Sequence, residues 1–334
     1  MSGFGGGVAS LSMAGGSGME SIDMQLTAQS TGTTFGSYYF VNSFSQAVTT
    51  NWGYTGYFSF VVPNDDVYRI QARGASGGYS GVSSPSGQNY GAQIEADIAV
   101  TKGWIILFIV GQTGVATNDN EGSGGGGMSA VAYTTNTSNS TASVAAANPL
   151  VVGGGGGGAC YNREGQDNAR GYGNINSTYS QMLIGKAGLT SGYSTLGHGW
   201  PVGGGGLANH TGANNIAGWN GGGFNGGGSG NSARSGGSHG SGFREGAAGG
   251  LNQGGSYGGG GFGGGGGGAE NCGYGGGAGG YSGGSSGGYT SGCGGHGGGG
   301  GSFYENSGSN SLVSATNTSN NMGYVRIRSS DQYP

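Results

Sequence analysis

The chain has 334 residues, enough for one large domain or two modest ones. Glycine accounts for 91 residues, charged residues for only 7%, and the net charge is −4. Disordered chains usually have few aromatic residues and a high net charge, whereas this chain has 10% aromatic residues and little charge. Its ten basic residues are scattered and form no cluster of the kind that binds nucleic acid or anionic lipid. We therefore expect no nucleic-acid partner.

The N-terminus and the apolar runs bear on export and membrane insertion. Met1–Val8 has neither the basic segment nor the apolar segment of a signal peptide, so we expect either use without Sec export or a processed mature form. The longest apolar run, Trp104–Val110, has seven residues, whereas a bilayer-spanning helix needs about 20. We expect no membrane span.

Residues 1–34 are small and polar, with one brief alternation of apolar residues at Ile22, Met24 and Leu26. This pattern indicates either a short edge strand or a flexible arm. An arm of this kind would add as a strand to a neighbouring subunit, although N-termini are more often disordered. We treat these three residues as candidates for an assembly arm.

Strand patterns follow in chain order. Phe35–Phe44 and Tyr54–Val62 are rich in residues that favour strands, while Val67–Arg73 and Gln93–Val100 alternate apolar and polar residues as antiparallel strands do. Their outward charges, Arg69 and Arg73 against Glu95 and Asp97, are placed to pair across strands. Further strands are predicted at Trp104–Val110, Met128–Tyr133, Leu150–Val152 and Tyr324–Arg328; the best helix candidate, Tyr179–Lys186, is short and uncapped.

The composition changes near residues 118–122, since only 20 of the 91 glycines precede residue 121. The densest glycine stretch is Gly258–Gly301. Ordering glycine is costly in entropy, so such a stretch is either a disordered linker or a region where neighbours pack too closely for a Cβ. With only 5 prolines and no triplet register, collagen is excluded. Single large residues separate the tracts, which favours packed polyproline II segments with an aromatic rim: Trp219, Phe224, Phe243, Tyr257, Phe262, Tyr274, Tyr281, Tyr289 and Phe303.

The predicted fold is all-β, an antiparallel jelly-roll-like sandwich with an inserted bundle of glycine polyproline II helices and essentially no α-helix. Its parts are an N-terminal arm (1–34), the first part of the sandwich (35–120), the glycine-rich bundle with loops (121–310) and a returning strand (311–334).

A series of motifs resembles a known family. Their order is similar to that in the glycine-rich extracellular domain of the anaplastic lymphoma kinase and leukocyte tyrosine kinase receptors, over roughly residues 57–328. The motifs are Val61–Ile70 leading into Gly74–Gly78, Ile106–Gly114, Gly124–Ala130, Pro149–Gly153, Gly260–Gly263 and Gly323–Ile327.

The resemblance implies a partly TNF-like β-sandwich combined with glycine polyproline II helices, an extracellular setting and a protein ligand. This chain departs from those receptors, since it lacks a transmembrane segment and kinase motifs and has fewer cysteines. A weaker similarity links it to glycine-rich phage adhesins, whose glycine-helix bundles hold receptor-binding loops.

No sequence pattern points to catalysis, a cofactor or a metal. Matches to GxGxxG follow from composition alone, and Gly185-Lys186-Ala187 lacks the hydroxyl residue of a phosphate-binding loop. The four histidines have no catalytic partners nearby in sequence, and Cys293-Gly-Gly-His296 is an isolated pair. We expect a protein that is not an enzyme.

Two kinds of covalent modification are candidates. Five sequons are present, although several are expected by chance in this composition, at Asn136, Asn139, Asn176, Asn209 and Asn317. Cys272 and Cys293 flank a glycine/tyrosine loop and form the disulfide candidate; the alternatives are a bridge from Cys160 to one of them, or free thiols.

The first functional hypothesis is an extracellular or surface-associated structural protein that assembles into a filament or coat as a homo-oligomer or polymer, with glycans as a further partner. The alternatives are a receptor-binding adhesin and a soluble ligand-binding module. Tyrosines and loop tryptophans (Trp52, Trp200 and Trp219) suit either partner recognition or packing between subunits.

Overall fold

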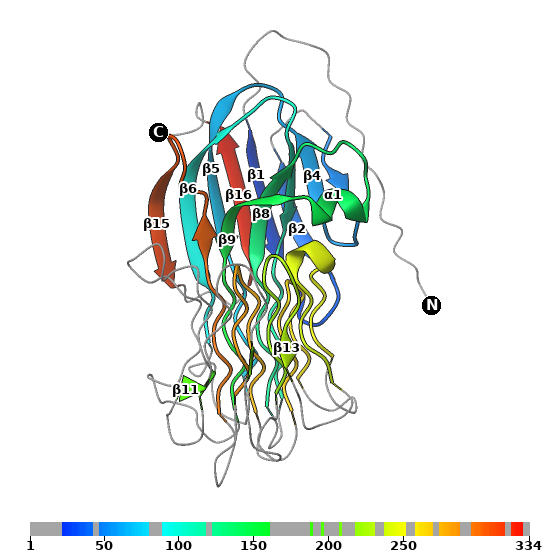
Figure 1. Ribbon diagram of the computed structural model, residues 1–334, viewed down its shortest axis with the longest axis vertical. Coiled ribbons are helices and arrows are strands. Elements are labelled where there is room, and N and C mark those ends of the chain that lie inside the picture. Colours follow the sequence, from blue (N-terminus) through cyan, green and yellow to red (C-terminus); the bar gives the residue numbers. More distant parts are fainter. Residues whose placement is uncertain are drawn as a thin grey trace.

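In the computed structural model, two β-sheets form the upper part of the molecule and glycine-rich segments run beneath them along the long axis (Figure 1). The structure describes residues 22–42, 47–79, 89–117, 122–160, 188–189, 195–196, 207–208, 218–230, 237–251, 258–269, 274–287, 295–317 and 322–329. The predicted helix candidate Tyr179–Lys186 lies outside these residues.

The first sheet has six strands, and every neighbouring pair is antiparallel. Four of its strands alternate buried and partly exposed residues, as a sheet with one buried face requires. In spatial order the strands are β15 (Ser311–Asn317), β6 (Ala92–Val100), β5 (Asp66–Arg73), β16 (Tyr324–Ser329), β1 (Asp23–Ala28) and β2 (Tyr38–Asn42).

The second sheet also has six strands in all-antiparallel order. They are β14 (Phe303–Tyr304), β9 (Asn148–Gly153), β8 (Ser129–Thr134), β7 (Ile105–Ile109), β4 (Phe58–Val61) and β3 (Thr49–Thr50). Two minor pairs are β10 (Gly188–Leu189) with β11 (Thr195–Leu196), and β12 (Leu207–Ala208) with β13 (Ser229–Gly230). The described helices are α1 (Thr141–Ala145) and a 3-10 turn, Phe243–Glu245.

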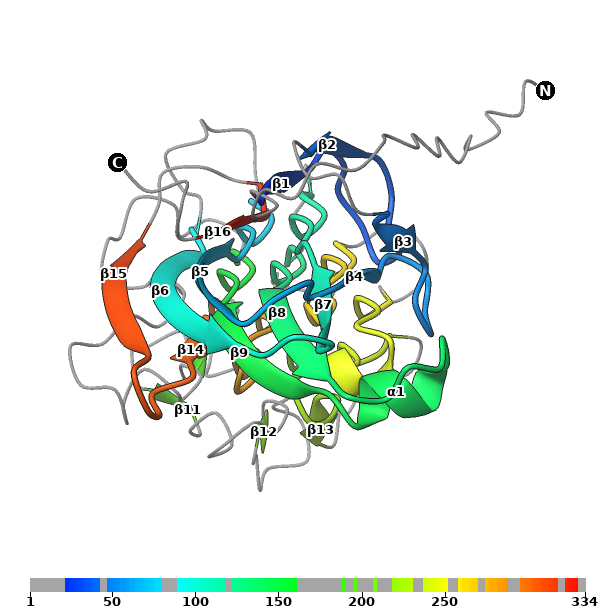
Figure 2. The same cartoon turned by 90° about the horizontal axis from the view of Figure 1, so that it is seen from above.

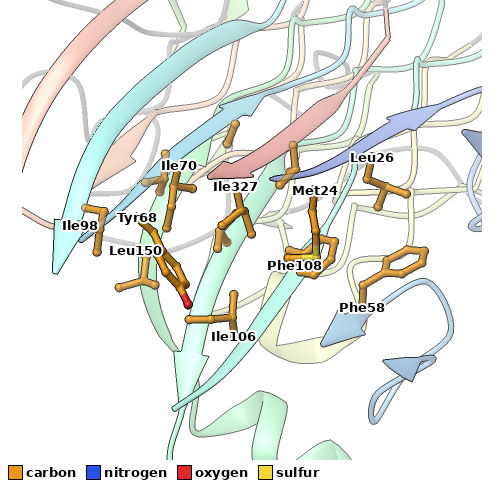
Figure 3. Packing of buried hydrophobic residues seen from close by; sticks show 14 of the residues in the cluster. Met24, Leu26, Phe58, Tyr68, Ile70, Ile98, Ile106, Phe108, Leu150 and Ile327 are labelled. Atoms are coloured by element: carbon orange, nitrogen blue, oxygen red, sulfur yellow. The ribbon is translucent and has the colours of Figure 1, made fainter. Parts of the chain in front are cut away.

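The two sheets face each other across an apolar core (Figure 3). Ile106 and Phe108 of β7 point into this core, whereas Ile105, Leu107 and Ile109 join a second cluster on the other side of the sheet. Both faces of β7 are thus covered, which explains why the sequence of this strand is uninterruptedly apolar. The all-β sandwich expected from the sequence is confirmed, as is the near absence of helix.

Strand β1 differs from either expectation for the N-terminal region. It is an interior strand, paired with β16 on one side and β2 on the other. Ile22, Met24 and Leu26 are buried in the sandwich core. Their alternation places all three side chains on the inner face of the sheet, so they belong to the core of their own chain. In the described residues they form neither an exposed edge nor a free arm.

The glycine-rich segments pack backbone against backbone. Hydrogen bonds join different segments, as from Gly155 N–H to the carbonyl of Gly279 and from Gly158 N–H to that of Gly276, each at 2.8 Å. A Cβ added at almost any of these glycines would come closer to a neighbouring backbone than the 3.0 Å that real Cβ atoms keep. Glycine is required here because the backbones touch.

The neighbours of one segment recur with a period of three residues. A Cβ on Gly154 would meet Gly300, and a Cβ on Gly157 would meet Gly297. Gly155 and Gly158 in the same way face Gly126 and Ser123, and the intervening Gly156 faces Asn89. Viewed from above, the segments appear as coils beneath the sheets (Figure 2).

Buried tyrosines make stability sensitive to base. Burial raises the pKa of Tyr57 well above its ordinary value, and burial also raises that of Tyr68, with Asp66 adding to the shift. The stability contributed by these two tyrosines is therefore fully present below the unfolded-state pKa of about 10. It is lost as pH rises above that value, because the tyrosines of the unfolded chain ionise first. Urea unfolding between pH 8 and pH 12 should show this loss, and Tyr68→Phe should make it shallower. An identical loss in both proteins would contradict this prediction.

Candidate functional site

The outer face of the first sheet carries a set of ion pairs. Arg69 pairs with Asp97 at 2.8 Å, and Arg328 pairs with Glu95 at 3.0 Å. Both partners in each pair lie on interior strands, since β5, β6 and β16 are flanked on both sides. These four charges therefore satisfy one another within a single copy of the chain.

A third pair joins the two ends of the chain. Arg326 donates to both carboxylate oxygens of Asp23, at 2.9 Å and 2.8 Å, although 303 residues separate them in sequence. The hydrogen bond from Arg326 holds the pKa of Asp23 below its ordinary value. The sequence prediction that both Arg69 and Arg73 pair with β6 is only half right: Arg73 instead lies over the ring of Tyr324 and donates to the carbonyl of Met322 at 2.9 Å.

The two outermost strands of the first sheet present a different surface. Within the part of the chain that the structure describes, β2 pairs only with β1, and β15 only with β6. Tyr39 and Val41 of β2 are 57% and 43% exposed, and Leu312 and Val313 of β15 are 39% and 42% exposed. We call these strands the β2 edge and the β15 edge; they lie at opposite ends of the sheet (Figure 2).

Neither edge strand contains a charged residue or a proline, two of the features that keep sheet edges from pairing with other molecules. Soluble proteins protect sheet edges with charged residues, proline, β-bulges or a covering helix or loop. The β2 edge reads Tyr-Tyr-Phe-Val-Asn and the β15 edge Ser-Leu-Val-Ser-Ala-Thr-Asn, without a charge or a proline in either. One bulge interrupts β15 between Leu312 and Ser314. The two edges are thus the surface of the described chain best suited to binding another strand.

The sequons fall in different settings. Asn136 and Asn139 lie exposed in the loop after β8. The Asn136 side chain accepts hydrogen bonds from Ser138 of its own sequon, while that of Asn139 accepts one from Gly53 N–H at 2.7 Å. Asn317 is the last residue of β15. Asn176 and Asn209 lie outside the described residues; within the described residues, Asn136 and Asn139 are exposed and accessible to glycosylation.

The cysteine prediction falls largely outside the described residues, which include neither Cys272 nor Cys293. Cys160 is buried in the glycine bundle, and its N–H donates to Nδ1 of His296 at 3.3 Å. Among the described residues, no three His, Cys, Asp or Glu side chains gather into a set of metal ligands.

Aromatic residues between the glycine tracts are buried where the bundle meets the second sheet. Phe224 and Phe243 stack with ring centroids 4.6 Å apart, and Tyr281 and Phe303 stack at 4.4 Å. Trp219, expected in a loop, is buried inside the bundle because Gly237 leaves room against its ring. Trp52 is half-buried, and Trp200 lies outside the described residues. The two stacked pairs, Phe224 with Phe243 and Tyr281 with Phe303, therefore join the glycine bundle to the second sheet.

Comparison of the chain with protein-family models and with curated proteins gives no match in either case. The resemblance to kinase-receptor ectodomains therefore still depends on its motifs. Within the described residues, no helix has the length and apolar character needed to cross a bilayer.

The sequence predicts β2 as a strand but not as an edge, and it does not predict β15. The signal for β15 is faint, because Leu312 and Val313 are consecutive and the bulge that follows breaks the alternation. The absence of charge from both segments is visible in the sequence, but it gains meaning only once their place in the sheet is known.

Proposed function

We propose that this protein is an extracellular or surface-associated structural protein that assembles with copies of itself into a filament or coat. One observation carries the proposal: both edge strands of the first sheet are uncharged and expose aromatic and aliphatic side chains. Exposed apolar edges pair with other strands unless something prevents it. A chain with only 7% charged residues provides little electrostatic repulsion to oppose such pairing.

We further propose that the glycine segments are polyproline II helices and give each subunit a stiff core. A period of three residues and hydrogen bonds between segments support this, because a polyproline II helix has three residues per turn and no internal bonds. Vibrational circular dichroism should then contain a polyproline II component beside that of β-sheet; a spectrum of β-sheet alone would contradict it.

The proposed assembly is tested on the purified full-length chain. Sedimentation and electron microscopy over a range of concentrations should show regular polymers, and intact mass on the same sample should exceed 32.4 kDa if the sequons carry glycans in a secretory host. Substituting all five sequon asparagines (Asn136, Asn139, Asn176, Asn209 and Asn317) by glutamine is the control that removes every acceptor. Discrete particles at every concentration would contradict the structural role.

A receptor-binding adhesin is the second candidate, and the far end of the bundle favours it. Gly287 N–H donates to Gly275, Gly275 N–H donates to Gly295, and Cys160 N–H donates to His296 nearby. These hydrogen bonds bring residues from distant parts of the sequence together at one end of the glycine bundle, and a stiff bundle would present this end to a receptor. Binding of a discrete, non-polymerising protein to intact cells would favour this function.

A further inference from the structure

We propose that copies of this chain join head to tail, with the β2 edge of one copy pairing with the β15 edge of the next, so that the first sheet continues unbroken through the polymer. This inference rests on the proposed structural function and adds the partner surface, the strand direction and the repeat.

The strand order determines the direction of pairing. Five antiparallel steps lead from β15 to β2, so these two strands run in opposite directions within one copy. When a second copy is placed beside the first without being turned end over end, its β15 therefore lies antiparallel to the first copy's β2. An odd number of strands would have brought two parallel strands together.

In the proposed contact the second sheet would also continue from one copy of the chain to the next. It too has six antiparallel strands, and β5 packs on β8 and β9 while β14 contacts β6. The β14 end of the second sheet therefore lies on the β15 side of the molecule, and its β3 end lies on the β2 side. A shift that brings β2 to β15 also brings β3 of one copy toward β14 of the next.

The chemistry of the two edges is compatible. The outer face of the first sheet has its ion pairs on interior strands, and the contact would bring together only uncharged residues such as Val41 and Val313. No like charges meet, and apolar side chains from both strands become buried on pairing.

The contact uses different surfaces on the two partners, so it does not close on itself unless the rotation happens to complete a ring. Strands lie about 4.8 Å apart, which gives an axial step of about 29 Å for six strands. Sheet twist makes this step a screw rather than a pure translation. The expected product is a helical filament with this rise per subunit.

Two substitutions block one edge each. Val41→Lys places a charge on the β2 edge, and Val313→Lys places one on the β15 edge. Val67→Lys is the matched control, because Val67 is 37% exposed on the interior strand β5 of the same sheet. Both edge variants should sediment as monomers at concentrations where wild type and the control form filaments.

Mixing the two edge variants is the decisive experiment. Each retains one working edge, so an equimolar mixture should give dimers and nothing larger. Filaments from wild type and from both edge variants alike would overturn the edge contact but leave the structural function standing. Dimers formed by either variant alone would indicate that like edges pair and would overturn the head-to-tail arrangement. Absence of polymers from wild type itself would reject the proposed function first.

Discussion

Gly157→Ala should destabilise the protein by about 3 kcal/mol, at the upper end of the usual cost of overpacking a tight interior. An added Cβ would overlap the carbonyl oxygen of Gly297. That neighbour has little freedom to move away, because Gly297 N–H donates to the carbonyl of Gly158 at 2.9 Å. Equilibrium unfolding in urea, compared with wild type, measures the loss.

Gly226→Ala is the matched control for this substitution. A Cβ on Gly226 meets nothing closer than 3.8 Å, at a carboxylate oxygen of Glu245. Its stability should change by less than about 1 kcal/mol, with a small gain if the methyl group mainly restricts the unfolded chain. Equal stabilities for the two variants would show that the glycine segments do not pack against one another as described.

Phe262→Ala should cost about 3 to 5 kcal/mol, the usual loss for truncating a fully buried phenylalanine. The Phe262 ring lies 5.3 Å from the ring of Phe35, which in turn packs on Phe58 of β4. The backbone of Phe262 donates to the carbonyl of Gly32 and accepts from Gln112 N–H. This residue therefore connects a glycine segment both to the β1–β2 loop and to the second sheet.

Phe262→Leu separates packing from simple loss of volume. It keeps most of the apolar surface and should cost roughly 1.5 kcal/mol or less. Thermal unfolding followed by tyrosine fluorescence and by far-ultraviolet dichroism should remain a single transition in this variant. If the alanine and leucine variants unfolded alike and close to wild type, Phe262 would not be the connection between the glycine segments and the two sheets.

The sequence predicts those parts of the fold whose pattern is local. Alternation in Val67–Arg73, Gln93–Val100 and Tyr324–Arg328 locates β5, β6 and β16 to within a residue or so, because one face of each strand is buried and the other is wet. The apolar run at Trp104–Val110 likewise locates β7.

Features that depend on distant partners are not visible in the sequence. The alternation at Ile22–Leu26 indicates a strand, but not that its partner β16 lies at the other end of the chain. Helix α1 has five residues, too few to show a helical period, and its cap at Ser140 lies in a run of hydroxyl residues that favours a loop equally well. Which glycine segment lies beside which cannot be derived from tracts that are chemically identical.

The period of three residues in the glycine segments has a consequence for how their lengths can change. In the proposed polyproline II segments, with three residues per turn, inserting or deleting one residue would turn all following residues by about 120°, so each would meet a different neighbour. Adding or removing three residues restores every neighbour after one turn. Tracts in related chains should therefore differ in length by whole turns, and a sequence that lengthens by single glycines should do so only beyond the packed part of a tract.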